Sequence, residues 1–116
     1  KILAAQEPDG YLQTAYTLAS RERWPERWSP RNRADHEGYV AGYFIESAIN
    51  HYTLTEGTDK RLYDAAKKLA DQFERTAGHR LLLSAGSTGK FYAQIRNGAP
   101  FDVFLSADDE TPRRIG

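Results

Sequence analysis

The chain has 116 residues, and its 16 basic and 16 acidic side chains cancel. This length predicts one domain over residues 1–116, because it supports a single core and not two independent ones. The charge balance gives no overall attraction to nucleic acid or to an anionic membrane, and the absence of cysteine excludes disulfides, thiolate metal sites and cysteine nucleophiles.

Membrane insertion and secretion have no signal in the sequence. No apolar stretch approaches the roughly 18 residues that span a bilayer, and the N-terminus lacks a charged-then-apolar pattern. We therefore expect a soluble protein of unassigned compartment, made in a recombinant cytoplasm if it is engineered. Methionine is absent, position 1 included, which is typical of a mature, trimmed or excised piece.

The first 38 residues predict little regular structure. Residues 1–6 can form a short helix or an edge strand, which the turn signal Pro8-Asp9-Gly10 ends. Residues 11–18 are too short for a clear assignment. Residues 20–38 hold two prolines and two tryptophans and predict an irregular but ordered loop, because tryptophan is costly to leave exposed.

Two consecutive stretches then carry apolar residues at the three- and four-residue steps of an amphipathic helix. We expect Asp35 to cap the first helix and Gly57 to end it. Thr58 or Asp59 caps the second, and Gly78 ends it. Because the link is short, the helices form an antiparallel αα-hairpin. The apolar residues are Tyr39, Val40, Tyr43, Phe44, Ala48 and Tyr52, then Leu62, Ala65, Ala66, Leu69, Phe73 and Ala77.

The pattern changes after Gly78. Continuous apolar runs at 79–85 and 102–107 predict buried strands, and residues 89–98 between them predict a short helix. This spacing indicates a right-handed parallel βαβ unit. A third strand would come from the Lys1 or Tyr11 region or from a second copy. The predicted fold class is mixed α/β: an antiparallel αα-hairpin fused through a shared helix to a parallel βαβ unit, followed by the start of a further element.

The loop Gly86-Ser87-Thr88-Gly89 is a candidate anion site. It lies where a strand would pass into a helix, so free N–H groups and two hydroxyls can converge on a tetrahedral oxyanion. It is not a nucleotide-binding P-loop, because Phe91 follows Gly89-Lys90 and Ser84 stands at the earlier glycine position. The alternative is that the loop only connects two elements.

The stretch from Phe73 to Ile115 carries three markers: Gly-Ser-Thr-Gly, Gln-Ile-Arg-Asn-Gly-Ala-Pro and Asp-Val-Phe-Leu-Ser-Ala-Asp. It resembles the N-terminal part of periplasmic molybdate-binding proteins of ABC transporters. The resemblance implies that Ser87, Thr88 and Ala107 line an oxyanion site, with Thr88 in place of the family's usual serine. The family closes its site with another serine, where Gln6 stands here, and with a second lobe. A half-site without these groups should bind weakly, because a dianion is strongly solvated.

Residues 1–72 resemble a different family. The stretches at 1–18 and 35–72, with their Gln-x-x-Asp-Gly-Tyr-Leu and His-Glu-x-Tyr-x-x-Gly motifs, are similar to glycoside hydrolase family 127, the β-L-arabinofuranosidases, which fold as an (α/α)6 barrel. The resemblance implies that Gln6, His36 and Glu37 are former sugar-pocket contacts. The family's zinc-bound cysteine nucleophile has no counterpart in this sequence.

The residues themselves give no complete catalytic or metal site. Asp35, Glu37 and Glu46 could supply an acid and a nucleophile, but two helices cannot enclose a sugar between them. The three scattered histidines lack metal-ligand spacing, so we expect no metal, cofactor or enzyme activity. Glu22 and Glu26 interrupt the basic loop around Trp24 and Trp28, which favours packing over nucleic-acid binding.

The two resemblances meet inside the second helix, between Gln72 and Phe73. A join within a helix keeps the apolar stripe in phase. The sequence therefore predicts an engineered or recombined chimera: a glycosidase-like helical segment over 1–72 and a molybdate-binding-protein-like βαβ segment over 73–116, without catalytic activity. Weak oxyanion binding is the alternative function, and an arabinofuranosidase remnant with turnover is a third. Either repacking or homodimerisation is expected, because the apolar surfaces that absent parent elements once covered need burial.

Overall fold

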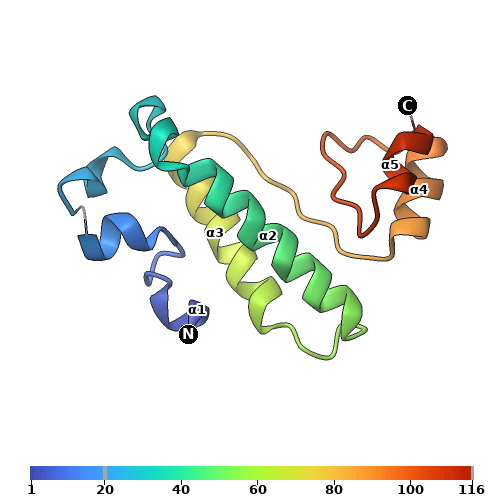
Figure 1. Cartoon of the computed structure of the whole chain (residues 1–116), viewed down its shortest axis with the longest axis horizontal. Helices are drawn as coiled ribbons and strands as arrows, with labels where there is room; N and C mark the ends of the chain where they lie inside the picture. The colour runs from blue at the N-terminus through green and yellow to red at the C-terminus, as the bar shows by residue number, and fades with distance from the viewer. Residues whose placement is uncertain (20, 116) are drawn as a thin grey trace.

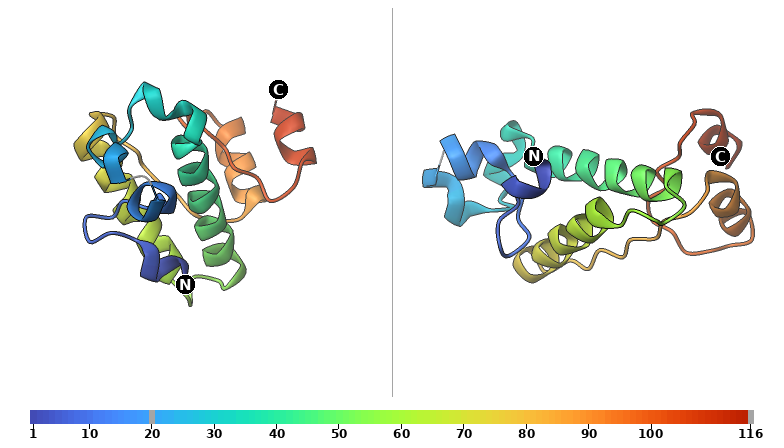
Figure 2. Two further views of the ribbon diagram at one scale, coloured as in Figure 1. Left: turned by 60° about the vertical axis from the view of Figure 1, so that its left-hand side comes forward. Right: turned by 90° about the horizontal axis from the view of Figure 1, so that it is seen from below.

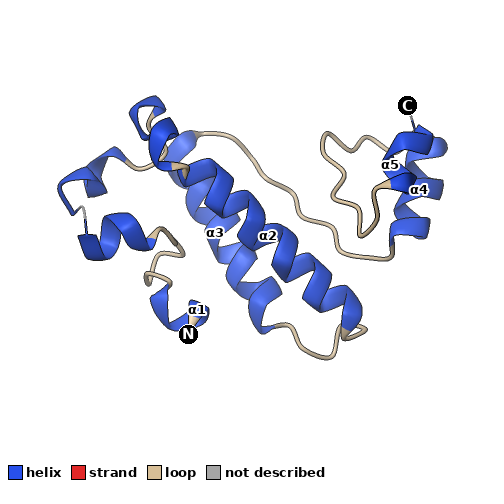
Figure 3. Cartoon of the chain, viewed as in Figure 1, coloured by secondary structure: helices blue, strands red, loops and turns tan. Residues whose placement is uncertain are grey.

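A computed structural model describes residues 1–19 and 21–115, without the side chains of residues 23–25. Within that part of the chain, all regular structure is helical and no strand is present (Figure 3). The predicted α/β class and parallel βαβ unit are therefore wrong. No described helix is both long enough and apolar enough to cross a bilayer.

The molecule is elongated: the N-terminal segments lie on one side, two long helices lie side by side in the middle, and the C-terminal segments lie at the far end (Figure 1). Two short 3₁₀-helices fill most of the region that the sequence predicts as an irregular loop, and a short π-helix precedes them. The elements, in chain order, are α1 (Ile2–Ala5), η1 (Ala15–Ala19), η2 (Arg21–Glu26), η3 (Pro30–Asp35), α2 (Glu37–Leu54), α3 (Arg61–Ala77), α4 (Thr88–Arg96) and α5 (Glu110–Ile115).

The predicted helical hairpin is present. Helices α2 and α3 run antiparallel and pack against each other, and they diverge away from the loop that joins them (Figure 2). Small residues dominate their contact, so the two backbones can approach closely. Gly78 ends α3 in the left-handed conformation, as predicted. The core residues are Ala41, Phe44, Ile45 and Ala48 from α2 with Ala65, Ala66 and Leu69 from α3.

The ends of the two helices differ in how they are held. The prediction that Asp35 caps α2 is wrong: the cap residue is His36, with φ 59°, while the Asp35 carboxylate accepts a hydrogen bond from Tyr16. The prediction that Thr58 or Asp59 caps α3 is also wrong, because the cap residue is Lys60. The Asp59 carboxylate nevertheless accepts from the Arg61 backbone N–H at 3.2 Å. The Arg61 guanidinium and then His51 also donate to Asp59, which holds the pKa of that carboxyl well below its usual range.

The N-terminal region folds back onto the hairpin through Trp28, whose backbone has φ 62°. Its ring packs edge-on against Tyr11 and Phe73, with centroids 5.7 and 5.0 Å away. Its indole N–H donates to Gln72 Oε1 at 2.7 Å. Trp28 therefore holds both sides of the predicted join. The other predicted anchor, Trp24, lies outside the side chains described.

The two predicted strands are extended loops. Leu82 and Val103, which the sequence places inside buried strands, are each 74% exposed. A strand is stable only when a neighbour pairs with its backbone, and no part of the described chain supplies that neighbour. The predicted helix between them is present as α4, and the further element as α5.

Burial stops at the predicted join. Among the described residues, every buried one lies between Gly10 and Gln72. The chain exposes 8060 Å² of surface, whereas a compact monomer of this mass exposes about 6,400 Å². Its radius of gyration of 15.4 Å also exceeds the roughly 13.4 Å of a compact chain. The first segment therefore provides the core, and the second extends from it.

Candidate functional site

The loop at the start of α4 brings together the three residues predicted to bind an oxyanion. Ser87 is the N-cap of α4, and its hydroxyl oxygen accepts from the Lys90 backbone N–H at 3.3 Å. Thr88 is the first helical residue, and its Oγ1 accepts from the Ala107 backbone N–H at 3.2 Å. These groups come from segments 19 positions apart, so the chain itself assembles a half-site.

The half-site contains hydrogen-bond donors that the described residues leave available for a ligand. In the part of the chain that the structure describes, no hydrogen bond uses the backbone N–H groups of Thr88 and Gly89. They point out of the first turn of α4, where the helix dipole favours negative charge. The hydroxyl protons of Ser87 and Thr88 are further donors, because both oxygens act as acceptors in the hydrogen bonds above.

The loop backbone has a steric reason to contain glycine at position 86. A Cβ there would lie 3.1 Å from the ring of Phe91, which folds back over the loop. The carbonyl of Gly86 accepts from the Thr53 hydroxyl at 3.3 Å, which links the loop to α2. Gly89 meets no such restriction, because a Cβ at this position would contact no neighbouring side chain or segment within 4 Å.

The electrostatic surroundings oppose a dianion. Asp108 follows Ala107 directly, and its carboxylate accepts from the backbone N–H and the hydroxyl of Thr111 at 2.6 and 2.9 Å. These hydrogen bonds lower the pKa of Asp108, so the carboxyl stays ionised. Ser87 and Ala107 are exposed. A ligand here keeps contact with water and has a fixed negative charge as neighbour.

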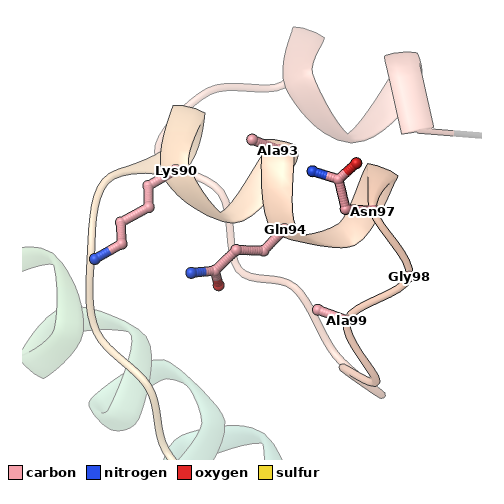
Figure 4. Close-up of a pocket in the computed structure, with 6 residues that line it drawn as sticks. All are labelled: Lys90, Ala93, Gln94, Asn97, Gly98 and Ala99. Atoms are coloured by element: carbon pink, nitrogen blue, oxygen red, sulfur yellow. The ribbon is translucent and has the colours of Figure 1, made fainter.

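A shallow hollow of about 500 Å³ lies along α4 and the turn after it (Figure 4). The side chains of Lys90 and Gln94 extend to the same side of the helix in this view. Small residues and one amide complete the lining: Ala93, Asn97, Gly98 and Ala99. Because Ser87, Thr88 and Ala107 are not part of this hollow, it supplies no wall for the half-site.

The residues predicted as former sugar-pocket contacts have structural partners instead. The Gln6 amide donates to the backbone carbonyls of Gly10 and Ala65, at 2.9 and 2.8 Å, which ties the N-terminus to α3. The His36 side chain is exposed and lies beside the Tyr39 ring, with centroids 5.7 Å apart. Neither residue lines the hollow along α4.

Glu37 is the centre of a buried polar network that the sequence did not reveal. Its carboxylate accepts from the Tyr11 hydroxyl at 2.5 Å, the Trp28 backbone N–H at 2.8 Å and the Asn32 amide at 3.1 Å. Burial, and then the hydrogen bond to Glu37, raise the pKa of Tyr11. The partners lie in loops and in the short helix η3, where no periodic apolar pattern indicates which residues are buried. Gln13 and Gln72 are buried polar residues of the same region.

Metal ligation has no geometric support. No group of three or more histidine, aspartate and glutamate side chains within residues 1–19 and 21–115 could hold a metal ion. Glu37 and His36 are neighbours in sequence, but the first points into the core and the second to solvent. The described side chains therefore form one buried structural network, and the loop before α4 remains a candidate anion site.

Comparison with known proteins confirms both resemblances. A family described as "Bacterial extracellular solute-binding protein" matches residues 57–115, and "Beta-L-arabinofuranosidase, GH127 catalytic domain" matches residues 1–85. No solved structure matches the chain.

Three curated relatives divide between the two halves. The molybdate-binding protein ModA of Azotobacter vinelandii is 57% identical over 49 residues, which are 42% of this chain and 19% of that protein. ModA of Rhodobacter capsulatus is 43% identical over 51 residues, 44% of this chain and 20% of that protein. The non-reducing end β-L-arabinofuranosidase of Bifidobacterium longum is 39% identical over 80 residues, 66% of this chain and 11% of that protein.

The chain thus spans a fifth or less of the length of each of these relatives. The two family matches overlap over residues 57–85, which include all of α3. The chain belongs to the GH127 β-L-arabinofuranosidase catalytic-domain family through residues 1–85 and to the bacterial extracellular solute-binding protein family through residues 57–115.

Proposed function

We propose that the chain is a recombined structural domain without catalytic activity, and that its remaining ligand function is weak binding of a tetrahedral oxyanion such as molybdate. The observation that carries this proposal is the contact of Thr88 Oγ1 with the Ala107 backbone N–H at 3.2 Å. It brings the predicted binding groups to one point although the described residues form no sheet. The two relatives named as molybdate-binding proteins match this part of the chain.

Weak affinity follows from the exposure of the half-site. A dianion bound here loses the water molecules on one side and gains only a few donors in return, while its other side stays hydrated. The ionised Asp108 next to Ala107 adds repulsion. We therefore expect a dissociation constant on the order of 1 mM, which corresponds to about −4 kcal/mol.

The absence of catalysis is a separate part of the proposal. Glu37, the carboxylate within the His-Glu-x-Tyr-x-x-Gly motif, is buried and already accepts three hydrogen bonds. It is therefore not presented to a sugar. The sequence also has no cysteine to act as nucleophile. A chromogenic β-L-arabinofuranoside should stay intact during prolonged incubation with the purified chain, and turnover above the buffer rate would contradict this part.

Oxyanion binding is tested by a titration of the isotopically labelled chain with molybdate, followed by amide chemical shifts. We expect saturable shifts at Thr88, Gly89 and Ala107. The variant Thr88→Ser keeps the hydroxyl and should bind like the parent. Thr88→Val keeps the shape without the hydroxyl and should lose saturable binding.

Two results would contradict the proposal. Equal shifts in Thr88→Val and in the parent chain would mean that the hydroxyl does not contact the ligand. A dissociation constant in the low micromolar range would mean that the half-site is closed in solution by groups that the structure places elsewhere. Sulfate, titrated in parallel, shows whether the site prefers the larger oxyanion.

A further inference from the structure

A broad apolar groove of about 950 Å³ lies between the hairpin and the C-terminal segments. Its walls come from α2 and α3, from the extended residues 80–86, from α4 and from the loop before α5. Several of the most exposed large apolar side chains gather there: Tyr39, Tyr43, Leu81, Leu82, Val103 and Leu105. These six residues are called the groove face below.

The groove face is exposed because the chain does not close over it. Figures 1 and 2 show α4 and α5 at one end of the molecule, joined to the hairpin by the extended segment. Large contiguous apolar patches are rare on soluble monomers and mark interaction surfaces. The groove face is therefore a surface that needs a partner.

The exposed area of the whole chain is large enough to cover a protein partner. The 8060 Å² that the chain exposes exceed the surface of a compact monomer by about 1,700 Å². A stable interface of standard size takes about 800 Å² from each partner. The excess, taken over the whole chain, is about twice the area that one partner contributes to such an interface.

The charges permit a second copy. The chain has a formal net charge of zero, so two copies do not repel each other as a whole. The groove is lined by one basic residue, Arg80, and two acidic residues, Glu46 and Asp102. A two-fold contact presents both signs from both copies, so these charges can pair across it.

We infer that two copies of this chain associate through the groove face, each covering the apolar side chains of the other. The contact is isologous: the same residues contribute from both sides. It buries side chains that the separate chain leaves in water. The neutral surface offers no particular attraction to an anionic membrane.

Sedimentation of the purified chain over a wide concentration range tests this inference. We expect a species of twice the 13.1 kDa of one chain. Leu82→Lys and Val103→Lys should each raise the dissociation constant on the order of 10- to 100-fold, because a buried apolar side chain is replaced by a charge. Both side chains are 74% exposed in the single chain, so the substitutions should leave its fold intact.

Leu54→Lys is the matched control. Leu54 is 83% exposed at the end of α2 and does not line the groove. This variant should dimerise like the parent. The melting curve of each of the three variants should match that of the parent chain when both are in the same oligomeric state. Thr88 and Ala107 also line the groove, so the experiment is done without oxyanion and does not depend on binding at the half-site.

Three results would overturn the inference. The first is a mass of one chain at every concentration. The second is an equal loss of association in Leu54→Lys and Leu82→Lys, which would mean non-specific apolar contact. The third is a monomer that floats with neutral phosphatidylcholine vesicles through the groove face, which would identify a lipid surface as the partner.

Discussion

Replacing Glu37 with alanine removes one acceptor that three donors share. The Tyr11 hydroxyl, the Trp28 backbone N–H and the Asn32 amide all bond to its carboxylate. Tyr11 and Asn32 are 0% and 2% exposed, so water cannot readily replace the lost acceptor. Each buried donor left without a partner costs about 1–3 kcal/mol.

Because the three contributions share one site and do not add fully, we expect Glu37→Ala to lower the free energy of unfolding by about 3–5 kcal/mol. That is a large part of the roughly 5–15 kcal/mol of an ordinary domain. Urea unfolding followed by tryptophan fluorescence measures the change, since Trp28 contacts the network directly. Glu37→Gln, which keeps one carbonyl oxygen, should fall between the parent and the alanine variant.

Glu74→Ala is the control, because Glu74 is an exposed residue of α3. Its effect should stay within about 0.5 kcal/mol. If Glu37→Ala falls in the same range, the network does not hold the N-terminal region against the hairpin, and the structural role assigned to Glu37 is refuted.

Two further predictions concern the hairpin. The hydrogen bonds from Arg61 and then His51 lower the pKa of Asp59 in the folded chain. The ionised carboxyl therefore stabilises the fold at pH values above the pKa of about 3.9 that it has in the unfolded chain, and this stabilisation is lost as the pH falls further. The difference in urea midpoint between the parent and Asp59→Asn should therefore shrink below about pH 4, and a constant difference would contradict the prediction. Gly10 has φ 101°, and a Cβ there would lie 2.3 Å from the Lys68 carbonyl oxygen. Gly10→Ala should thus lower the melting temperature, whereas Gly42→Ala, in open space within α2, should raise stability by about 0.5–1 kcal/mol; the same sign in both would contradict the steric argument.

The helical hairpin could be predicted because helices satisfy their hydrogen bonds locally. The apolar repeat through Phe44, Ala48, Ala66 and Leu69 identifies the two faces that meet in the core. Gly78 marks the end of α3 without help from distant residues. For such elements the sequence pattern contains most of the necessary information.

The strands could not be predicted in the same way. Leu82 and Val103 lie in runs that suit a buried strand, but a strand also needs neighbours on its edges. The described chain does not provide them, and these side chains stay exposed. An apolar run therefore indicates what a segment would form in a sheet, and not that the sheet exists.

The candidate site shows the same division. The hydroxyl and glycine pattern and the family resemblance identified Ser87, Thr88 and Ala107, and the structure brings them together. The Glu37 network depends on the left-handed backbone of Trp28 and on contacts between irregular segments. No local pattern encodes such contacts, so they appear only in three dimensions.

Native-state hydrogen exchange tests the central claim most directly, namely that the core lies within residues 10–72 and that the second segment forms no sheet. At a concentration where the chain is monomeric, we expect slow exchange for the amides of α2 and of α3 through Gln72. The amides of residues 80–86 and 102–106 should exchange almost as fast as in an unfolded chain. Strong protection at both of these segments would show that they pair as strands, and would contradict the account.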